Sequence, residues 1–153
     1  MKNLDKVKRQ IINKLQENSS ITNAELAEQL KLPTTTVFDR IKKLNANGII
    51  SKRVAIVNPE KVGKETIAFV SLSLKGHSAK NVQKFLKSVE GLPEVLECYH
   101  IAGDFDFILK VIVDNIRTYE NFLLEKLTAI ENIGKIKTSF VMSTIKYQTK
   151  IPV

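Results

Sequence analysis

Apolar residues in the first fifty positions recur with the spacing of amphipathic helices. The first stripe consists of Leu4, Val7, Ile11, Ile12 and Leu15. Basic residues occupy the positions between them, and the polar run 18–20 ends the pattern. The sequence therefore predicts an amphipathic helix over roughly residues 5–17.

Two further helical patterns follow at once. Thr22 and Glu25 have the spacing of a capping box, in which each side chain satisfies a backbone amide of the other. The apolar positions behind them are Leu26, Ala27 and Leu30, and after residues 31–33 come Val37, Ile41 and Leu44. Gly48 suits the left-handed residue that closes a helix. This pattern predicts a three-helix (winged) helix-turn-helix domain over residues 1–50, with the helix-turn-helix at about 22–46.

The next segment favours an extended conformation. Ile49 and Ile50, followed by the apolar run 54–57, are typical of a strand, and Asn58-Pro59 ends that run. We expect a linker strand and connector over residues 51–64.

The rest of the chain alternates strand-like and helical patterns. The expected elements are a strand over 67–74, a helix over 82–89, strands over 95–102 and 105–113, a helix over 116–130 and a last strand over 136–147. Gly103-Asp104 is a favourable pair for a tight hairpin turn between the two middle strands. The order β-α-β-β-α-β predicts a ferredoxin-like domain over residues 65–153, and hence an α+β protein.

One face of this expected sheet is left without helices. Its apolar positions would be Ile67, Phe69, Ile108, Ile112, Val141 and Ile145. A patch of that size is unusual on a monomer, so a second copy stacked about a two-fold axis is the expected cover. A homodimer would also place two helix-turn-helix units side by side, as binding to a palindrome requires.

Charge is distributed unevenly along the 153 residues, whose formal net charge is +8. Residues 1–58 hold 11 Lys and Arg against 5 Asp and Glu, whereas the remaining 95 hold 13 against 11. A basic small domain attached to a nearly neutral larger one indicates a polyanionic partner for the first. The alternative is that these lysines only keep the surface soluble.

The third helix carries the residues best suited to DNA. Hydroxyls near its N-terminus can contact base edges and phosphates, and Arg40 could bind a guanine through two hydrogen bonds. Lys42, Lys43, Lys52 and Arg53 suit phosphates, although each could equally lie on a solvated surface. Phe38 could also pack against the first helix. The candidate DNA-binding residues are Asn23, Thr34, Thr35, Thr36, Phe38, Asp39, Arg40, Lys43, Lys52 and Arg53.

The chain as a whole resembles the Lrp/AsnC (leucine-responsive, feast/famine) family of transcription regulators. The resemblance rests on the joint order and spacing of several segments: residues 4–5, 21–27, 37–44, 47–50, 58–63, 93–99, 103–110 and 138–146. It implies an N-terminal DNA-binding domain, a linker strand and a C-terminal effector domain of the RAM type. It also implies dimers that commonly assemble into octamers.

In this family the effector is an amino acid bound between neighbouring dimers, close to the turn that matches residues 103–106 and to the last strand. An ammonium group needs an acceptor such as Asp104 or Asp106, and a carboxylate needs donors such as turn amides. Asp104 could alternatively serve only the hairpin turn. The candidate effector-binding residues are Gly103, Asp104, Phe105, Asp106, Thr138, Ser139, Ser143 and Thr144.

The sequence departs from the family pattern at the start of the third helix. A serine usually caps this helix, but Pro33 stands in its place and has no side-chain oxygen for capping. We expect Thr34 to take over as the cap and to shift the helix start by one residue.

Other functions are less well supported by the sequence. Some siroheme-decarboxylating enzymes resemble this architecture, but His77 and His100 are its only near-neutral proton carriers and no zinc or nucleophile motif accompanies them. An oligomeric sensor without DNA binding, or an RNA-binding sheet, remain alternatives. RNA-binding sheets expose stacking aromatics, whereas this face is mainly aliphatic. We expect no catalytic site, metal or cofactor.

The location of the protein follows from similar arguments. No apolar run approaches the ~20 residues of a transmembrane helix, the first residues lack the apolar stretch of a secretory signal, and Cys98 is the one cysteine. We expect a cytoplasmic protein that binds double-stranded DNA and no membrane.

Overall fold

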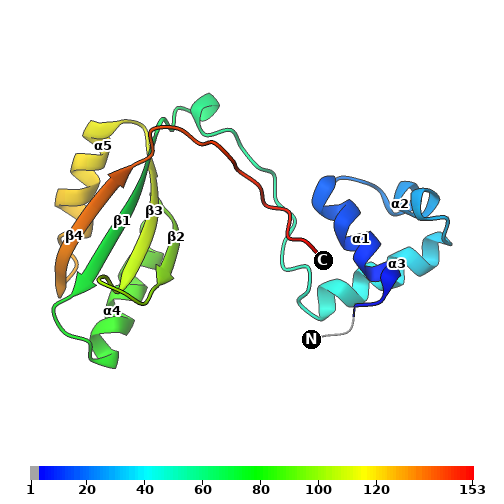
Figure 1. Cartoon of the computed structure of the whole chain (residues 1–153), viewed down its shortest axis with the longest axis horizontal. Helices are drawn as coiled ribbons and strands as arrows, with labels where there is room; N and C mark the ends of the chain where they lie inside the picture. Colours follow the sequence, from blue (N-terminus) through cyan, green and yellow to red (C-terminus); the bar gives the residue numbers. More distant parts are fainter. Residues whose placement is uncertain (1–3) are drawn as a thin grey trace. The chain divides into compact units, whose positions relative to one another are not determined.

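The computed structural model describes residues 4–153, so the first three residues of the expected domain 1–50 lie outside the described residues. The chain divides into two compact units (Figure 1). One comprises the residues up to Ile56 together with Lys146–Val153, and the other comprises Val57–Ile145. The last eight residues thus belong to the first unit, whereas the sequence analysis placed them in the second domain.

Three helices form the first unit. They are α1 (Lys6–Glu17), α2 (Asn23–Leu30) and α3 (Thr34–Ala46). Asp5 caps α1 by accepting a hydrogen bond from the backbone N–H of Lys8 at 2.9 Å. The predicted capping box of Thr22 and Glu25 is present at the start of α2. Each helix turns its apolar stripe inward to a common core, which includes Ile11, Leu26, Val37 and Leu44.

The ends of α3 confirm one expectation and correct another. Gly48 has φ +65°, and the backbone N–H of Ile49 donates to the carbonyl of Leu44 at 3.0 Å, which closes the helix as predicted. At the other end, Thr34 is the first helical residue and does not replace the missing cap. Pro33 is the N-cap, with the extended backbone usual at this position (φ −60°, ψ 139°), and it makes no side-chain hydrogen bond because proline has no side-chain acceptor.

The predicted linker strand is wrong for the isolated chain. Residues 51–58 belong to no helix or strand, and Val54, Ile56 and Val57 are exposed. A strand is defined by its hydrogen-bonded neighbour, and the described part of the chain supplies none here. For the same reason no β-wing follows α3 within residues 47–58.

The second unit is a four-stranded antiparallel sheet with helices on one face, as predicted. Its elements are β1 (Thr66–Leu74), α4 (Ala79–Glu90), β2 (Val95–His100), β3 (Phe107–Val113), α5 (Ile116–Asn121) and β4 (Ile133–Phe140). A π-helical segment (Phe122–Leu127) continues α5, so the second helix ends before the predicted residue 130. The strand order is β2-β3-β1-β4 (Figure 1).

Alternate residues of the strands form the core beneath both helices. Val70 and Leu72 of β1 and Leu109 and Val111 of β3 are fully buried. Phe85 of α4 packs on Phe107 of β3 with ring centroids 4.6 Å apart. The opposite sheet face carries the intervening residues, so the helices leave it uncovered as the sequence predicts.

Three strands are shorter than the sequence analysis expects. β2 stops at His100, β3 starts at Phe107 and β4 stops at Phe140 rather than at residue 147. Beyond β4 the chain leaves the edge of β1, so Ile145 is 91% exposed and is not part of the open sheet face. The apolar alternation continues to residue 147, but residues 141–147 belong to no strand because no neighbouring strand pairs with them among the described residues.

Candidate DNA and effector sites

The outer side of α3 is divided into two flanks with different charge arrangements. Val37, Ile41 and Leu44 hold the inner side in the core. The Arg40 flank is the hollow of about 380 Å³ lined by Asp5, Lys8, Thr36, Asp39, Arg40 and Lys43. The Lys42 flank is the hollow of about 670 Å³ whose lining includes Asn23, Phe38, Lys42, Asn45, Lys52 and Arg53.

The Lys42 flank has an apolar floor and a basic rim. Ile41 and Ile50 contribute to the floor. Phe38 also lines the hollow, and because its side chain is 53% exposed it is not buried against α1. None of the residues that line this hollow is acidic. Within residues 4–153, no carboxylate lies within 4.0 Å of the charged nitrogens of Lys42, Lys52 or Arg53. These cations are therefore available to a polyanion.

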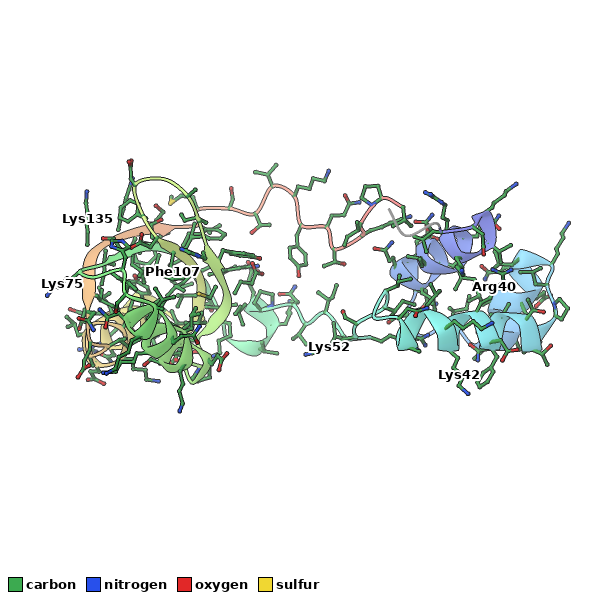
Figure 2. The ribbon with its side chains drawn as sticks, turned by 90° about the horizontal axis from the view of Figure 1, so that it is seen from below. Arg40, Lys42, Lys52, Lys75, Phe107 and Lys135 are labelled. Carbon is green, nitrogen blue, oxygen red and sulfur yellow. The ribbon has the colours of Figure 1, made fainter. Side chains whose placement is uncertain are left out.

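The Arg40 flank has its main cation paired internally. Arg40 Nη1 donates to Asp5 Oδ2 at 2.7 Å, and Lys8 Nζ lies 3.5 Å from the same oxygen. The backbone N–H of Lys8 and the Arg40 guanidinium lower the pKa of Asp5 to about 2. Figure 2 shows Arg40 on the side of α3 that faces α1, while Lys42 projects outward from the helix.

The predicted DNA-binding residues are distributed over both flanks. Thr34 and Thr35 are exposed at the N-terminus of α3. Thr36, Asp39, Arg40 and Lys43 line the Arg40 flank, and Asn23, Phe38, Lys52 and Arg53 line the Lys42 flank. Asp5 and Asn45, which line the two flanks, were not among the residues predicted from the sequence. Asp5 lies 35 positions from Arg40, and no local pattern links such distant residues.

The expected effector turn is a six-residue loop rather than a tight two-residue hairpin turn. It covers residues 101–106, in which the backbone N–H of Ile101 donates to the carbonyl of Asp106 at 2.8 Å. The backbone N–H of Asp106 donates to Leu72 of β1 at 2.9 Å, which ties the loop to the central strand. Gly103 has φ +141°, a conformation that favours glycine.

Asp106 fixes this loop through its side chain as well. Its Oδ2 accepts a hydrogen bond from the backbone N–H of Leu74 at 2.8 Å, and His77 Nε2 lies 3.1 Å from both carboxylate oxygens. The Leu74 amide lowers the pKa of Asp106 most, and His77 lowers it further. Asp104 is exposed, and no ion pair involves it among the residues described. Asp106 is held in place, whereas Asp104 is available to a ligand.

The polar residues near the last strand do not gather at this loop within one chain. Thr138 faces α5 and shares a hydrogen bond with the Tyr119 hydroxyl. Ser139 lies opposite Phe69 in the ladder with β1. Ser143 and Thr144 follow β4 at the end of the sheet marked by Ile67, whereas the loop lies at the end marked by Leu74.

Two residues beside the loop were not predicted as site residues. His77 contacts Asp106, and Lys135 Nζ lies 5.5 Å from the ring centroid of Phe105. His77 follows β1, and Lys135 lies near the start of β4. His100, the other histidine, stacks on Phe107 with ring centroids 4.8 Å apart, which supports the structural role expected of a strand histidine.

Two family models match the chain, one within the first unit and the other over most of the second unit and residues 146–151. A model described as winged helix-turn-helix DNA-binding covers residues 4–51, and the Lrp/AsnC ligand binding domain covers residues 67–151. The DNA-binding transcriptional activator DecR of Escherichia coli K12 is 33% identical over 150 residues, which are 98% of this chain and 99% of the relative. The leucine-responsive regulatory protein of Rhizobium meliloti is 31% identical over 94% of this chain and 92% of its own.

The chain belongs to the Lrp/AsnC family. It is a DNA-binding transcription regulator with a ligand-binding domain, as the sequence predicts.

Two solved structures have the same fold as this chain over almost its whole length. A transcriptional regulator from Neisseria meningitidis, solved in complex with L-Met, matches with a TM-score of 0.93 and 31% identity, covering 98% of this chain and 97% of that one. AsnC from Escherichia coli matches with a TM-score of 0.89 and 29% identity, covering 97% and 98%. In residues 4–153, no helix has both the length and the apolar character needed to cross a bilayer.

Proposed function

We propose that this Lrp/AsnC regulator binds duplex DNA through the outer side of α3 and changes its DNA binding or assembly when an amino acid binds at loop 101–106. The observation that carries the proposal is the unpaired basic rim of the Lys42 flank, in the same chain as a ligand-binding domain whose exposed loop offers a free carboxylate. The proposed activity is regulatory rather than catalytic, and its setting is the cytoplasm.

The DNA interface combines base contacts with phosphate contacts. Thr35 and Asp39 lie exposed on the part of α3 that faces away from the core, where a recognition helix meets base edges. Lys42, Lys52 and Arg53 form the rim that suits the sugar–phosphate backbone. Phe38 offers an exposed ring that fits a thymine methyl or a deoxyribose. The remaining proposed contacts come from Asn23, Thr34, Thr36 and Lys43.

The effector is proposed to be an amino acid bound against loop 101–106. The Neisseria meningitidis relative was solved with L-Met, and its fold matches this chain closely. Asp104 provides a free acceptor for the ammonium group, and the amides around Gly103 provide donors for the carboxylate. Asp106 holds the loop in place through Leu74 and His77. Phe105, with Lys135 beside it, is positioned to contact the effector side chain.

The remaining candidate residues need a second copy of the chain to reach this loop. Ser143 and Thr144 lie at the other end of the sheet, and Thr138 and Ser139 lie midway along it. We therefore propose that neighbouring copies complete the effector site. The open sheet face supports a homodimer, because Phe69 and Tyr99 are 38% and 52% exposed there. Glu97 and Lys110 form an ion pair at 2.9 Å on the same face. Octamers would arise by further assembly of these dimers.

Binding of duplex DNA and RNA to the purified chain, followed by thermal-shift screening with each of the twenty amino acids, tests this proposal. We expect retention of duplex DNA, weak retention of RNA, and a raised melting temperature with a subset of the amino acids, since selective binding stabilises the folded state. Equal affinity for RNA and DNA would exclude the proposed interface. Twenty unchanged melting temperatures would exclude the proposed effector class.

A further inference from the structure

We propose that Asp5 is a positioning residue that keeps Arg40 out of contact with DNA, so that Arg40 ties α1 to α3 while Lys42 and its neighbours meet the phosphates. This inference rests on the DNA interface proposed above. It assigns a role to a residue at the start of α1 and removes Arg40 from the expected base-contacting set.

The position of Arg40 on α3 supports the first part of the proposal. Arg40 follows Val37 by three residues and precedes Leu44 by four, so it borders the buried stripe rather than the outermost face of the helix. Its side chain is 31% exposed and extends toward the start of α1 (Figure 2). There its Nη1 meets Asp5 Oδ2 at 2.7 Å. The guanidinium thus connects two helices whose starts are distant in sequence.

Asp5 is fixed on both of its oxygens. Oδ1 accepts the backbone N–H of Lys8 at 2.9 Å and so caps α1, while Oδ2 accepts from Arg40. A carboxylate that is anchored by a helix cap cannot follow Arg40 outward if the guanidinium moves to DNA. Only Nη1 of the guanidinium pairs with Asp5, so its other N–H groups could still reach a phosphate. That phosphate would lie close to the fixed carboxylate of Asp5, whose negative charge repels it and offsets the charge of Arg40, so the gain from the contact is reduced.

The two flanks differ in what they offer to a phosphate. On the Arg40 flank, Asp5 and Asp39 lie among the cations and reduce the local positive potential. On the Lys42 flank, the lining contains no carboxylate. Arginine is the side chain best suited to bidentate binding of phosphate. Pairing Arg40 with Asp5 therefore lowers the affinity of the protein for DNA of any sequence. This reduction favours binding to one specific site, because many non-specific sites compete for the regulator.

The dependence of DNA affinity on salt distinguishes the two possible roles of Arg40. Each phosphate contact contributes about 0.9 to the slope of log K against log salt concentration. A residue that acts only through folding does not change this slope. The probes are a duplex that the wild-type chain selects from a random-sequence pool and a scrambled duplex of the same composition.

Three variants carry the test. Asp5→Asn removes the ion pair but keeps a good helix cap. Arg40→Gln removes the guanidinium, and Lys42→Gln removes a proposed phosphate contact. The ion pair of Lys64 with Asp114, at 2.6 Å and on the other unit, provides Lys64→Gln and Asp114→Asn as controls for the loss of one basic or one acidic charge.

We expect Lys42→Gln to reduce the slope by about 0.9 per protomer bound, whereas Arg40→Gln leaves it equal to that of Lys64→Gln. Asp5→Asn should steepen the slope by up to about 0.9 and tighten binding to the scrambled duplex relative to Asp114→Asn. The double variant Asp5→Asn with Arg40→Gln should return to the wild-type slope.

A reduced slope in Arg40→Gln, matching that of Lys42→Gln, would overturn the inference because it would place Arg40 on a phosphate. Weaker binding of Asp5→Asn to the selected duplex, with an unchanged slope, would also overturn it, because Asp5 would then orient Arg40 toward a base. An unchanged slope in Lys42→Gln together with unchanged binding in both other variants would instead contradict the proposed DNA interface.

Discussion

The unpaired cations of the Lys42 flank and the paired carboxylate of Asp106 differ in how much they contribute to the stability of their units. In the helical unit, Lys42, Lys52 and Arg53 are exposed and have no acidic partner among the described residues. In the sheet unit, Asp106 is bound by Leu74 and His77 and helps to hold loop 101–106. Loss of Lys42, Lys52 or Arg53 should therefore change DNA binding alone, whereas loss of the Asp106 carboxylate should change both stability and ligand response.

The largest expected effect concerns the unpaired cations. Replacing Lys42, Lys52 and Arg53 together with Gln should weaken binding to any duplex on the order of 10²-fold at physiological salt, because three phosphate contacts are lost. The free energy of unfolding should stay within about 0.5 kcal/mol of the wild type, as is usual for surface positions. Fluorescence anisotropy and denaturant melts measure the two quantities. A large loss of stability would contradict the claim that these cations contribute to DNA binding and not to folding.

Asp106→Ala should lower the stability of the sheet unit and also abolish the response of DNA binding to the effector. Without the carboxylate, the N–H of the buried Leu74 loses its partner, which costs about 1–3 kcal/mol. The response of DNA binding to the effector should disappear while operator affinity without effector is retained. Asp106→Asn is the matched control, since it keeps an acceptor for Leu74. A normal effector response in Asp106→Ala would move the pocket away from this loop.

The stability of the helical unit should depend on pH through the titration of Asp5. Its pKa is lowered from 3.8 to about 2, so the folded state binds this proton more weakly than the unfolded state. The stabilisation it provides is therefore present above pH 3.8 and is lost as the pH falls toward about 2. Melting temperatures recorded between pH 5 and about 2 should fall less steeply in Asp5→Asn than in the wild type. Parallel curves would show that the Lys8 amide and Arg40 do not lower the pKa of Asp5 in solution.

The smallest expected effect concerns the C-terminal segment on α1. The Gln16 amide donates to the carbonyl of Ile151 at 2.9 Å and accepts its N–H at 2.7 Å, and Lys150 pairs with Glu17 at 2.6 Å. Gln16→Ala should lower the free energy of unfolding by about 0.5–1.5 kcal/mol, given that these bonds are exposed. Gln10→Ala, on the same helix, is a control for the loss of a Gln side chain. Equal stability of the two variants would show that the segment contributes nothing to this unit.

Local patterns accounted for the helices and for the order of strands and helices along the chain. The capping box of Thr22, the glycine after α3 and the apolar alternation of β1 each depend on residues within a few positions of one another. The predicted strand over residues 54–57 did not form. Its apolar pattern gives only a preference for an extended conformation, and residues 4–153 supply no strand that pairs with it. The end of β4 was misplaced by seven residues for the same reason.

The candidate sites were harder to predict because they depend on contacts between distant residues. Outward-facing positions of α3 follow from helical periodicity, so most proposed DNA contacts could be named in advance. The pairing of Arg40 with Asp5 and of His77 with Asp106 spans 35 and 29 positions. Only the folded chain reveals that one predicted base-contacting residue is already paired and that a loop histidine borders the expected effector site.

The most direct test of the account is the affinity of the full chain for its selected duplex, measured with and without each amino acid that raises the melting temperature. Coupling between the two sites predicts a change in affinity of about 5–150-fold for at least one of them. Identical affinities in the presence of a bound amino acid would contradict the claim that this ligand regulates DNA binding.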